Sequence, residues 1–261
     1  MPPRTVALKT DVLQPGAVLS GKFRVERVIG AGGMGMVVAA FHLQLERRVA
    51  LKFLLPEMLR SEDIVARFFR EAKAAAKIQS EHVVRVLDVG TLDNGAPYMV
   101  MEYLEGRDLS EVLKARGPLP VADAVLYVLQ ACEALAEAHR AGIVHRDLKP
   151  ANLFLSQRPD GSATVKVLDF GISKATLLSD PVDTALTREA STLGSPAYMS
   201  PEQLRSARDV DPRTDVWSLG VVLHELLTGV TAFQASTLPE LHVAILAQPP
   251  SSVRVRRPDV P

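Results

Sequence analysis

The sequence has little of several features that mark particular classes of protein. Its 261 residues contain a single cysteine, so no disulfide can form within the chain, and a reducing compartment fits. Lys and Arg balance Asp and Glu, 30 against 30, which leaves no net field to attract nucleic acid or an anionic membrane. No run approaches the roughly 18 apolar residues that cross a bilayer, and the first residues lack the apolar centre of a signal peptide. We therefore expect a cytoplasmic protein without a nucleic-acid partner and without a membrane segment in this chain, and a tether beyond residue 261 stays open.

What the chain does have is apolar material, since 47% of its residues are hydrophobic. This length and composition allow one large domain or two lobes around a cleft. Cys132 lies among apolar residues at helical spacing, so we expect its side chain in the core rather than as a reactive thiol.

The first part of the chain, before about Gly106, reads as mostly β-structure. Residues up to 19 are expected to form a flexible leader. A helix is expected to open after Ser61, whose two successors are acidic, and to run to about Ile78. The turn Asp93-Asn94-Gly95 joins the last two strands. The strand-like runs are Phe23–Ile29, Val37–Phe41, Arg48–Leu54, Val83–Val89 and Pro97–Tyr103.

From residue 106 onward the pattern is mainly helical. Val125, Leu129, Cys132 and other apolar residues recur at helical spacing up to Gly142. Val216 to Leu227 is apolar almost all round, which predicts a helix buried at the centre of a lobe. The tail from 249 to 261 is rich in Pro and Arg and is expected to be extended. We expect lobes at 20–105 and 106–261.

One short window gathers the groups that phosphoryl transfer needs. It reads HRDLKPAN at 145–152 and is followed by DFG at 169–171. Asp147 can orient a hydroxyl and accept its proton, and Lys149 can neutralise a moving phosphoryl group. Asn152 and Asp169 can hold magnesium. A charged surface loop before a strand is the plainer interpretation, but a match of this length favours catalysis.

The glycines Gly30, Gly32 and Gly35 lie between two strands. A dinucleotide-binding turn uses similar glycines, but a helix must follow them, and here an apolar β-branched run follows. This order favours a flap that covers ATP phosphates with backbone amides, where a Cβ would block close approach. Further on, Lys52 lies inside an apolar strand and needs a partner. Glu71 in the next helix is the natural one, although both could be solvated charges.

These motifs resemble the bacterial eukaryotic-like Ser/Thr protein kinases, over about residues 20 to 250. The resemblance implies an α+β, two-lobed protein kinase fold, with a small antiparallel sheet and one main helix before a larger helical lobe. It implies Asp147 as catalytic base, Lys149 as γ-phosphate contact, Lys52 paired with Glu71, and Asn152 and Asp169 as metal ligands. The cofactors implied are ATP and Mg²⁺, with Mn²⁺ as an alternative.

The resemblance also assigns the adenosine site. Met101, Glu102 and Leu104 are similar to the hinge whose backbone binds adenine, with Met101 at the back of the pocket. Val37, Ala50 and Phe154 would sandwich the base, and Asp108 would lie near the ribose. Asp215, before Val216, resembles the residue whose helix anchors the catalytic loop, and Trp217 is expected in the core.

The segment from 172 to 199 is rich in Ser, Thr and Ala and resembles an activation loop. Arg146 and Lys174 are similar to residues that grip an activation-loop phosphate. The candidate acceptors are Thr187, Ser191 and Thr192. The spacing from Ser195 favours Ser191, whereas the resemblance to the bacterial family favours a site nearer Thr187. Ser200-Pro201-Glu202 resembles the end of this segment, with Ser in place of the commoner Ala.

The resemblance is incomplete in one respect: the family normally continues through further helices that have no counterpart in this sequence. One of them carries the Arg that pairs with the Glu at Glu202's position. Arg254, Arg256 and Arg257 are expected substitutes, and the helical lobe is expected to be incomplete. The expected activity is transfer of the ATP γ-phosphate to Ser or Thr of protein substrates, including self-phosphorylation between associating copies. A kinase-like binding or scaffold module, weak or inactive because of the gap, is the alternative.

Overall fold

The structure is a computed structural model, and it describes residues 14–32, 35–158, 160–170, 196–206 and 210–261. The chain divides into two compact units. The first comprises Met1–Lys77 and Val84–Leu104, and the second comprises Ile78–Val83 and Glu105–Pro261. The predicted arrangement of a small antiparallel sheet with one main helix before a larger, mainly helical part is confirmed.

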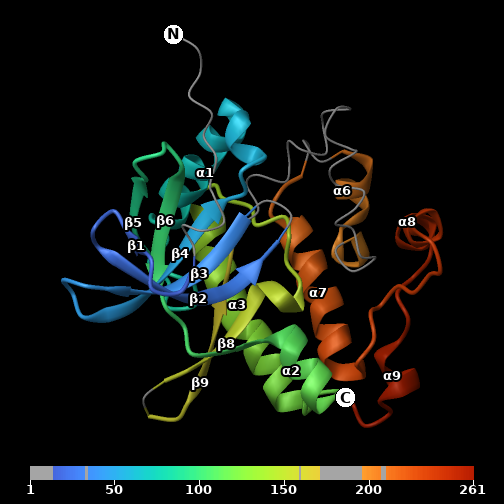
Figure 1. The fold of residues 1–261 in the computed structure, drawn as a ribbon. Helices are drawn as coiled ribbons and strands as arrows, with labels where there is room; N and C mark the ends of the chain where they lie inside the picture. The colour runs from blue at the N-terminus through green and yellow to red at the C-terminus, as the bar shows by residue number, and fades with distance from the viewer. Residues whose placement is uncertain (1–13, 33–34, 159, 171–195, 207–209) are drawn as a thin grey trace. The chain divides into compact units, whose positions relative to one another are not determined.

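The first unit is built on a six-stranded antiparallel sheet with the order β1-β2-β3-β4-β6-β5 (Figure 1). Gly95, in the predicted turn between the last two strands, has a φ of 89°, a conformation that suits glycine. The strands are β1 Val18–Leu19, β2 Phe23–Ala31, β3 Gly35–His42, β4 Arg47–Leu54, β5 Val86–Thr91 and β6 Pro97–Glu102.

The two faces of this sheet have different roles. Side chains alternate along a strand, and residues directly opposite each other point to the same side. Val38, Leu51 and Val100 are paired across β3, β4 and β6 and belong to the buried core. Their neighbours Val37 and Lys52 are also paired, and therefore lie together on the opposite face.

Two helical segments follow β4 in the first unit. They are the 3-10 helix η2, Met58–Arg60, and the helix α1, Glu62–Ala75. The Ser61 hydroxyl accepts a hydrogen bond from the backbone N–H of Ile64 and caps α1, as its sequence position predicts. The helix ends at Ala75, three residues before the expected Ile78.

The second unit combines a three-stranded antiparallel sheet with helices. The order of the sheet is β7-β8-β9. The strands are β7 Gly106–Asp108, β8 Leu153–Gln157 and β9 Ala163–Val167. The α-helices are α2 Leu109–Arg116, α3 Val121–Arg140, α6 Pro201–Arg205, α7 Arg213–Thr228, α8 Leu238–Ala247 and α9 Val253–Arg256, and the 3-10 helices are η3 Pro150–Asn152 and η4 Pro196–Tyr198.

Helix α7 is the main support of the second unit and packs against α3 (Figure 1). Ten of its side chains are buried, including Thr214 and Asp215. Its burial is less complete than its apolar sequence predicts, since Val216 is 65% exposed and Gly220 is also exposed. One side of α7 therefore lacks cover from the described residues.

Several sequence-based expectations need correction. The leader ends earlier than residue 19, because Val18 and Leu19 form β1 and Leu19 is buried in the first unit's core. Val83 does not start a strand of the first sheet but forms a parallel bridge to Val167. The tail is not wholly extended, since it contains α9.

Cys132 was expected in the core, and this prediction is wrong. Its side chain is exposed on α3. The buried side of α3 is instead lined by small residues such as Ala124, Ala131 and Ala138, which allow neighbouring elements to approach closely, while Leu129 faces outward and is 55% exposed. Within the described residues, no helix is both long and apolar enough to cross a membrane.

Candidate active site

The loop that carries the predicted catalytic residues is held by one buried carboxylate. Asp215, fully buried on α7, accepts hydrogen bonds from the backbone N–H groups of His145 at 2.9 Å and Arg146 at 2.8 Å. A third bond joins it to His139 Nε2 at 2.7 Å. Arg146 has a φ of 67°, an unusual conformation for a residue with a side chain. These bonds stabilise that backbone shape, and with it the direction of the next residue, Asp147.

His145 supports the loop from the inside. It is fully buried, and its Nδ1 accepts the backbone N–H of Asp147 at 3.2 Å. Its Nε2 therefore carries the proton, which it donates to the carbonyl oxygen of Leu168 at 2.9 Å. The histidine thus connects the catalytic loop to the segment that leads to Asp169.

Three predicted catalytic side chains converge in the second unit. Asp147 Oδ2 accepts a hydrogen bond from Asn152 Nδ2 at 3.1 Å and lies 3.4 Å from Lys149 Nζ. Asn152 Nδ2 also donates to the carbonyl oxygen of Asp147 at 2.7 Å. The cation and the amide favour the ionised, acceptor form of the Asp147 carboxylate. This is the form that a base or a hydroxyl-orienting group needs.

The predicted metal ligands follow from the same contacts. Because the amide nitrogen of Asn152 points to Asp147, its side-chain oxygen is the atom available to a cation. Asp169 adds a carboxylate, and its φ of 43° places it in the left-handed region. Leu168 N–H donates to the carbonyl oxygen of Asn152 at 2.9 Å, which joins the two segments. Oxygen donors of this kind suit Mg²⁺, which is commonly held by one or two protein carboxylates together with substrate phosphates.

The first unit contains the predicted lysine and glutamate pair. Lys52 Nζ on β4 lies 3.1 Å from Glu71 Oε1 on α1, and the two side chains are only 16% and 8% exposed. This excludes two separate solvated charges. A buried pair of this kind fixes the position of the ammonium group, because leaving either charge alone in the interior would be expensive.

The three glycines of this segment differ in the space that surrounds them. A Cβ on Gly35 would lie 2.4 Å from the carbonyl oxygen of Phe53, so the close approach of β4 requires glycine there. A Cβ on Gly30 would meet only the Val37 side chain, at 3.8 Å, and one on Gly32 would meet nothing within 4 Å. Gly30 and Gly32, and Gly32 in particular, therefore fit the expectation of space kept for a ligand.

The predicted adenine-binding residues of the first unit lie beside the lysine. Ala50 is paired with Met101 across β4 and β6, and both are buried on the same face as Lys52. Glu102 Oε1 accepts the backbone N–H of Arg85 at 2.8 Å, which fixes the end of β6 just before Leu104. The register thus brings the hinge residues close to the lysine.

The other predicted nucleotide contacts belong to the second unit. Asp108 and Phe154 are paired across β7 and β8. The Asp108 carboxylate caps α2 by accepting the backbone N–H of Glu111 at 2.9 Å. This structural role was not expected from the sequence. The predicted activation-loop residues Lys174, Thr187, Ser191 and Thr192 lie outside the described residues, as does Ser195.

Two residues of the loop's support were missed in the sequence. Gln203 Nε2 donates to the carbonyl oxygen of Arg146 at 2.9 Å. The Gln203 side chain also completes a capping box with Ser200 at the start of α6, and Ser200 Oγ lies 2.6 Å from Thr214 Oγ1. The spacing S-x-x-Q could have revealed the capping box. No sequence pattern indicated the bond between His139 on α3 and Asp215.

The suggestion that Arg254, Arg256 or Arg257 takes the place of the family's arginine at Glu202 is wrong for the described residues. Arg257 does not serve Glu202. It pairs with Asp259 at 2.9 Å and donates to the carbonyl oxygens of Leu119 and Leu227, closing the carboxyl end of α7. Among the residues that the structure describes, Arg254 and Arg256 form no ion pair with Glu202 either.

Comparisons with known proteins agree with this geometry. The model of the protein kinase domain family matches residues 23–258, so the chain belongs to this family. The serine/threonine-protein kinase pkn3 of Myxococcus xanthus is 42% identical over 244 residues, which cover 94% of this chain and 44% of that protein. The serine/threonine-protein kinase PknB of Mycobacterium leprae is 41% identical over 218 residues, which cover 82% of this chain and 34% of that protein.

The fold has solved counterparts. The crystal structure of the Mycobacterium tuberculosis PknI kinase domain superposes with a TM-score of 0.69 at 28% sequence identity, covering 95% of this chain and 86% of that one. The chain spans less than half the length of the curated relatives named above. Membership of the protein kinase domain family implies the use of ATP and a divalent metal ion.

Proposed function

We propose that this chain transfers the γ-phosphate of Mg-ATP to Ser or Thr hydroxyls of proteins. The observation that carries the proposal is the Asp147 carboxylate, which Lys149 and Asn152 contact while Asp215 holds its loop. Curated relatives at about 40% identity are named as serine/threonine-protein kinases. The alternative of an inactive scaffold module is less well supported, since every catalytic position is filled.

In the proposed reaction, Asp147 accepts a hydrogen bond from the acceptor hydroxyl and takes its proton as the new O–P bond forms. Lys149 stabilises the charge that develops on the transferred group. The bond from the γ-phosphorus to the bridging oxygen breaks, and ADP leaves with that electron pair. Most of the rate gain would come from positioning and charge stabilisation, since no covalent intermediate with the protein is needed.

The remaining predicted residues would bind the nucleotide. Lys52, held by Glu71, would contact the α- and β-phosphates. Gly30, Gly32 and Gly35 would bring backbone amides over the phosphates. Val37, Ala50 and Phe154 would enclose adenine, with Met101 at the back of its pocket, the backbone of Glu102 and Leu104 at its edge, and Asp108 near the ribose.

Asn152 and Asp169 would hold Mg²⁺, with Mn²⁺ as an alternative ion. When bound, the metal neutralises phosphate charge and orients the phosphate oxygens. Asn152 has a second task in this scheme, because its amide nitrogen orients Asp147 while its oxygen faces the cation.

We also propose that activity increases when the activation loop is phosphorylated on Thr187, Ser191 or Thr192 by a second copy of the chain. Arg146 supports this proposal, since its guanidinium has no carboxylate partner in the described part of the chain and could pair with a phosphate. Lys174 would be the second cation. The cytoplasmic location expected from the composition stays a proposal that cell fractionation can test.

Asp147→Asn tests the main proposal. The variant should lose transfer by at least about 100-fold while it binds a fluorescent ATP analogue as before, because Asp147 acts on the hydroxyl. Asp93→Asn, in an exposed turn, is the control and should transfer phosphate normally. Activity of Asp147→Asn within about tenfold of wild type would exclude this role.

A further inference from the structure

The half of β2 that leads to the glycines has little support from the rest of its sheet. On one side, its backbone pairing with the preceding segment stops at Val25, which bonds to Gly16 and Ala17. From Glu26 onward, β3 is its only ladder partner among the described residues, and a register shift between Val25 and Arg27 interrupts that ladder. No side chain of β2 after Val25 is buried. A strand held this weakly needs a further contact to keep one position.

Tyr103 supplies such a contact from the segment that follows β6. It belongs to the predicted hinge and directly precedes Leu104. Its hydroxyl accepts a hydrogen bond from the Arg27 guanidinium at 3.0 Å. The Arg48 guanidinium lies over the Tyr103 ring, 5.8 Å from its centroid, and donates from Nε to Glu26 Oε2 at 3.0 Å. The tyrosine is therefore joined to β2 twice, directly through Arg27 and indirectly through Arg48 and Glu26.

A bulge in β2 explains why two consecutive residues of this strand take part. Val25 pairs with Ala40 and Arg27 pairs with Ala39, which leaves Glu26 as an extra residue outside the register. Consecutive side chains of a regular strand point to opposite faces, whereas a bulge re-aims one of them. Glu26 and Arg27 can therefore both reach the same cluster, which a regular strand would not allow.

The two ends of this contact serve opposite ends of the nucleotide in the proposed function. The hinge would bind adenine, while Gly30 and Gly32, which follow Arg27 in the chain, would lie over the phosphates. Gly30 is three residues from Arg27, about 10 Å along an extended strand. The position of β2 at Arg27 therefore sets the space available to a ligand that contacts the hinge and the glycines together. Adenosine, which has no phosphate, would depend on the hinge alone.

We propose that Tyr103 is a positioning residue for ATP, because its bond to Arg27 holds the glycine end of β2 at a fixed place relative to the hinge. Holding the strand in advance lowers the cost of ordering it when ATP binds. Arg48, fixed by Glu26, keeps the tyrosine ring in the orientation that this bond requires. The inference rests on the proposed use of ATP and adds to it a side chain that none of the sequence motifs indicated.

Calorimetric titration with Mg-ATP and with adenosine separates the two ends of the nucleotide. Tyr103→Phe removes only the hydroxyl and should weaken ATP binding about threefold to tenfold, the usual range for one hydrogen bond. Adenosine should bind this variant as it binds wild type. Arg27→Met removes the donor and should have the same effect, and the double variant should bind ATP no more weakly than Arg27→Met. Steady-state kinetics should show the same separation, with KM for ATP raised and kcat unchanged.

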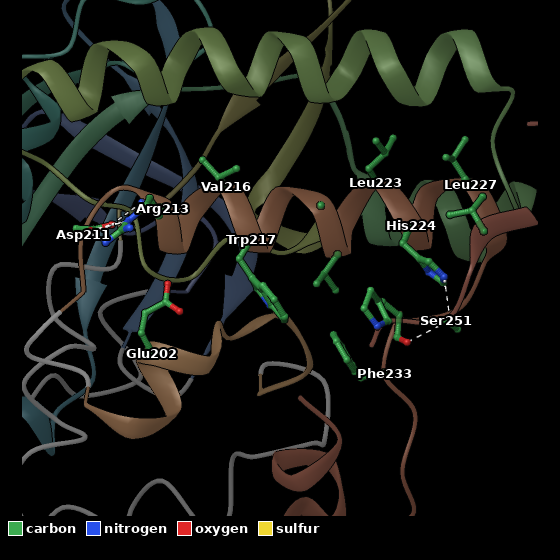
Figure 2. Close-up of a pocket in the computed structure, with 15 residues that line it drawn as sticks. Glu202, Asp211, Arg213, Val216, Trp217, Leu223, His224, Leu227, Phe233 and Ser251 are labelled. Carbon is green, nitrogen blue, oxygen red and sulfur yellow. Dashed lines mark hydrogen bonds and ion pairs between the residues drawn. The ribbon is translucent and has the colours of Figure 1, made fainter. Parts of the chain in front are cut away.

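Two arginine variants control for the loss of a positive charge. Arg24→Met removes a charge from the same strand, where the Arg24 guanidinium lies 5.4 Å from the centroid of the Phe41 ring. Arg213→Met removes a charge from the second unit, where Arg213 pairs with Asp211 at 2.7 Å (Figure 2). Both variants should bind ATP like wild type. Thermal unfolding checks that every variant folds.

Several outcomes would overturn the proposal. Equal losses of ATP and adenosine affinity in Tyr103→Phe would mean that the tyrosine shapes only the hinge. An unchanged ATP affinity in Tyr103→Phe, or a loss in Arg24→Met as large as in Arg27→Met, would exclude the hydrogen bond as the cause. A wild type that binds no ATP would contradict the proposed function and this inference together, whereas unchanged variants of an ATP-binding wild type would contradict this inference alone.

Discussion

Asp215 Oδ1 accepts the backbone N–H of Arg146 at 2.8 Å, across 69 positions of sequence. The same carboxylate binds the backbone of His145 and the ring of His139. A single buried side chain of α7 thus sets the shape of the loop that presents Asp147. The orientation of the catalytic carboxylate is therefore a property of the helical core as much as of the loop itself.

Asp215→Asn should destabilise the protein by about 3 kcal/mol and reduce phosphate transfer. The amide can accept through only one atom, so a buried donor loses its partner. Urea unfolding gives the free energy, and a transfer assay gives the activity. Asp211→Asn, which removes only an exposed partner of Arg213, should change stability little. Equal effects of the two changes would contradict the anchoring role.

Lys52→Met and Glu71→Ala should each lower kcat/KM for ATP by about 100-fold or more, and the double variant should be little worse than either. The residues act as one unit, because Glu71 is useful only by positioning Lys52. Steady-state kinetics on the three variants measure the coupling. Lys73→Met, on the exposed side of α1, serves as the control. Losses in log rate that simply add would reject the functional pair.

Gly35→Ala and Gly32→Ala should separate folding from nucleotide binding. The new Cβ at Gly35 meets the backbone oxygen of Phe53 at 2.4 Å, so we expect a loss of about 1–3 kcal/mol in unfolding free energy. At Gly32 there is space, so stability should hold while KM for ATP rises. Chemical denaturation and kinetics distinguish the two effects. A stable Gly35→Ala variant would mean that β4 can shift.

Tyr198→Phe should make stability more sensitive to pH. The Tyr198 hydroxyl donates to Glu225 Oε2 at 2.6 Å. Burial raises the pKa of Glu225 above its usual 4.5, and the Tyr198 bond opposes that rise. When the folded-state pKa of a carboxyl is higher than its unfolded-state pKa, the protein loses stability as the pH rises above the unfolded-state pKa. Without the tyrosine bond the pKa rises further, so the penalty should be about 1 kcal/mol at pH 7.5 and smaller at pH 4.5.

Unfolding midpoints across this pH range measure the effect. Tyr127→Phe is a matched control, since Tyr127 on α3 forms no hydrogen bond to Glu225 among the described residues. A penalty for Tyr198→Phe that is constant or largest at low pH would contradict the linkage between the two groups.

The sequence was most informative where chemistry restricts the choice of residue. The pairing of Lys52 with Glu71 was predicted because a lysine in an apolar strand needs a nearby carboxylate. Asp147, Lys149 and Asn152 are close in the chain, so their convergence follows from one short loop. The capping role of Ser61 is equally local.

The sequence was least informative about which apolar surface is covered. In α3, hydrophobicity pointed to Leu129 and Cys132, yet small residues such as Ala131 are buried because neighbouring elements come close there. Periodicity finds an apolar helix side but does not say what packs against it. The bonds of Asp215 to His139, and of Gln203 to Arg146, depend on distant segments for the same reason.

The short segment Ile78–Val83 has a consequence for how the chain folds. It leaves the first unit after α1 and pairs Val83 with Val167, and the carbonyl oxygen of His82 accepts the Val167 N–H before the chain returns to β5. The chain therefore passes between the units three times, and neither unit is one continuous piece of sequence. Each unit consists of two segments that are joined through the other unit, so we expect both units to unfold in a single cooperative step. For the same reason, neither unit can be excised as one continuous fragment.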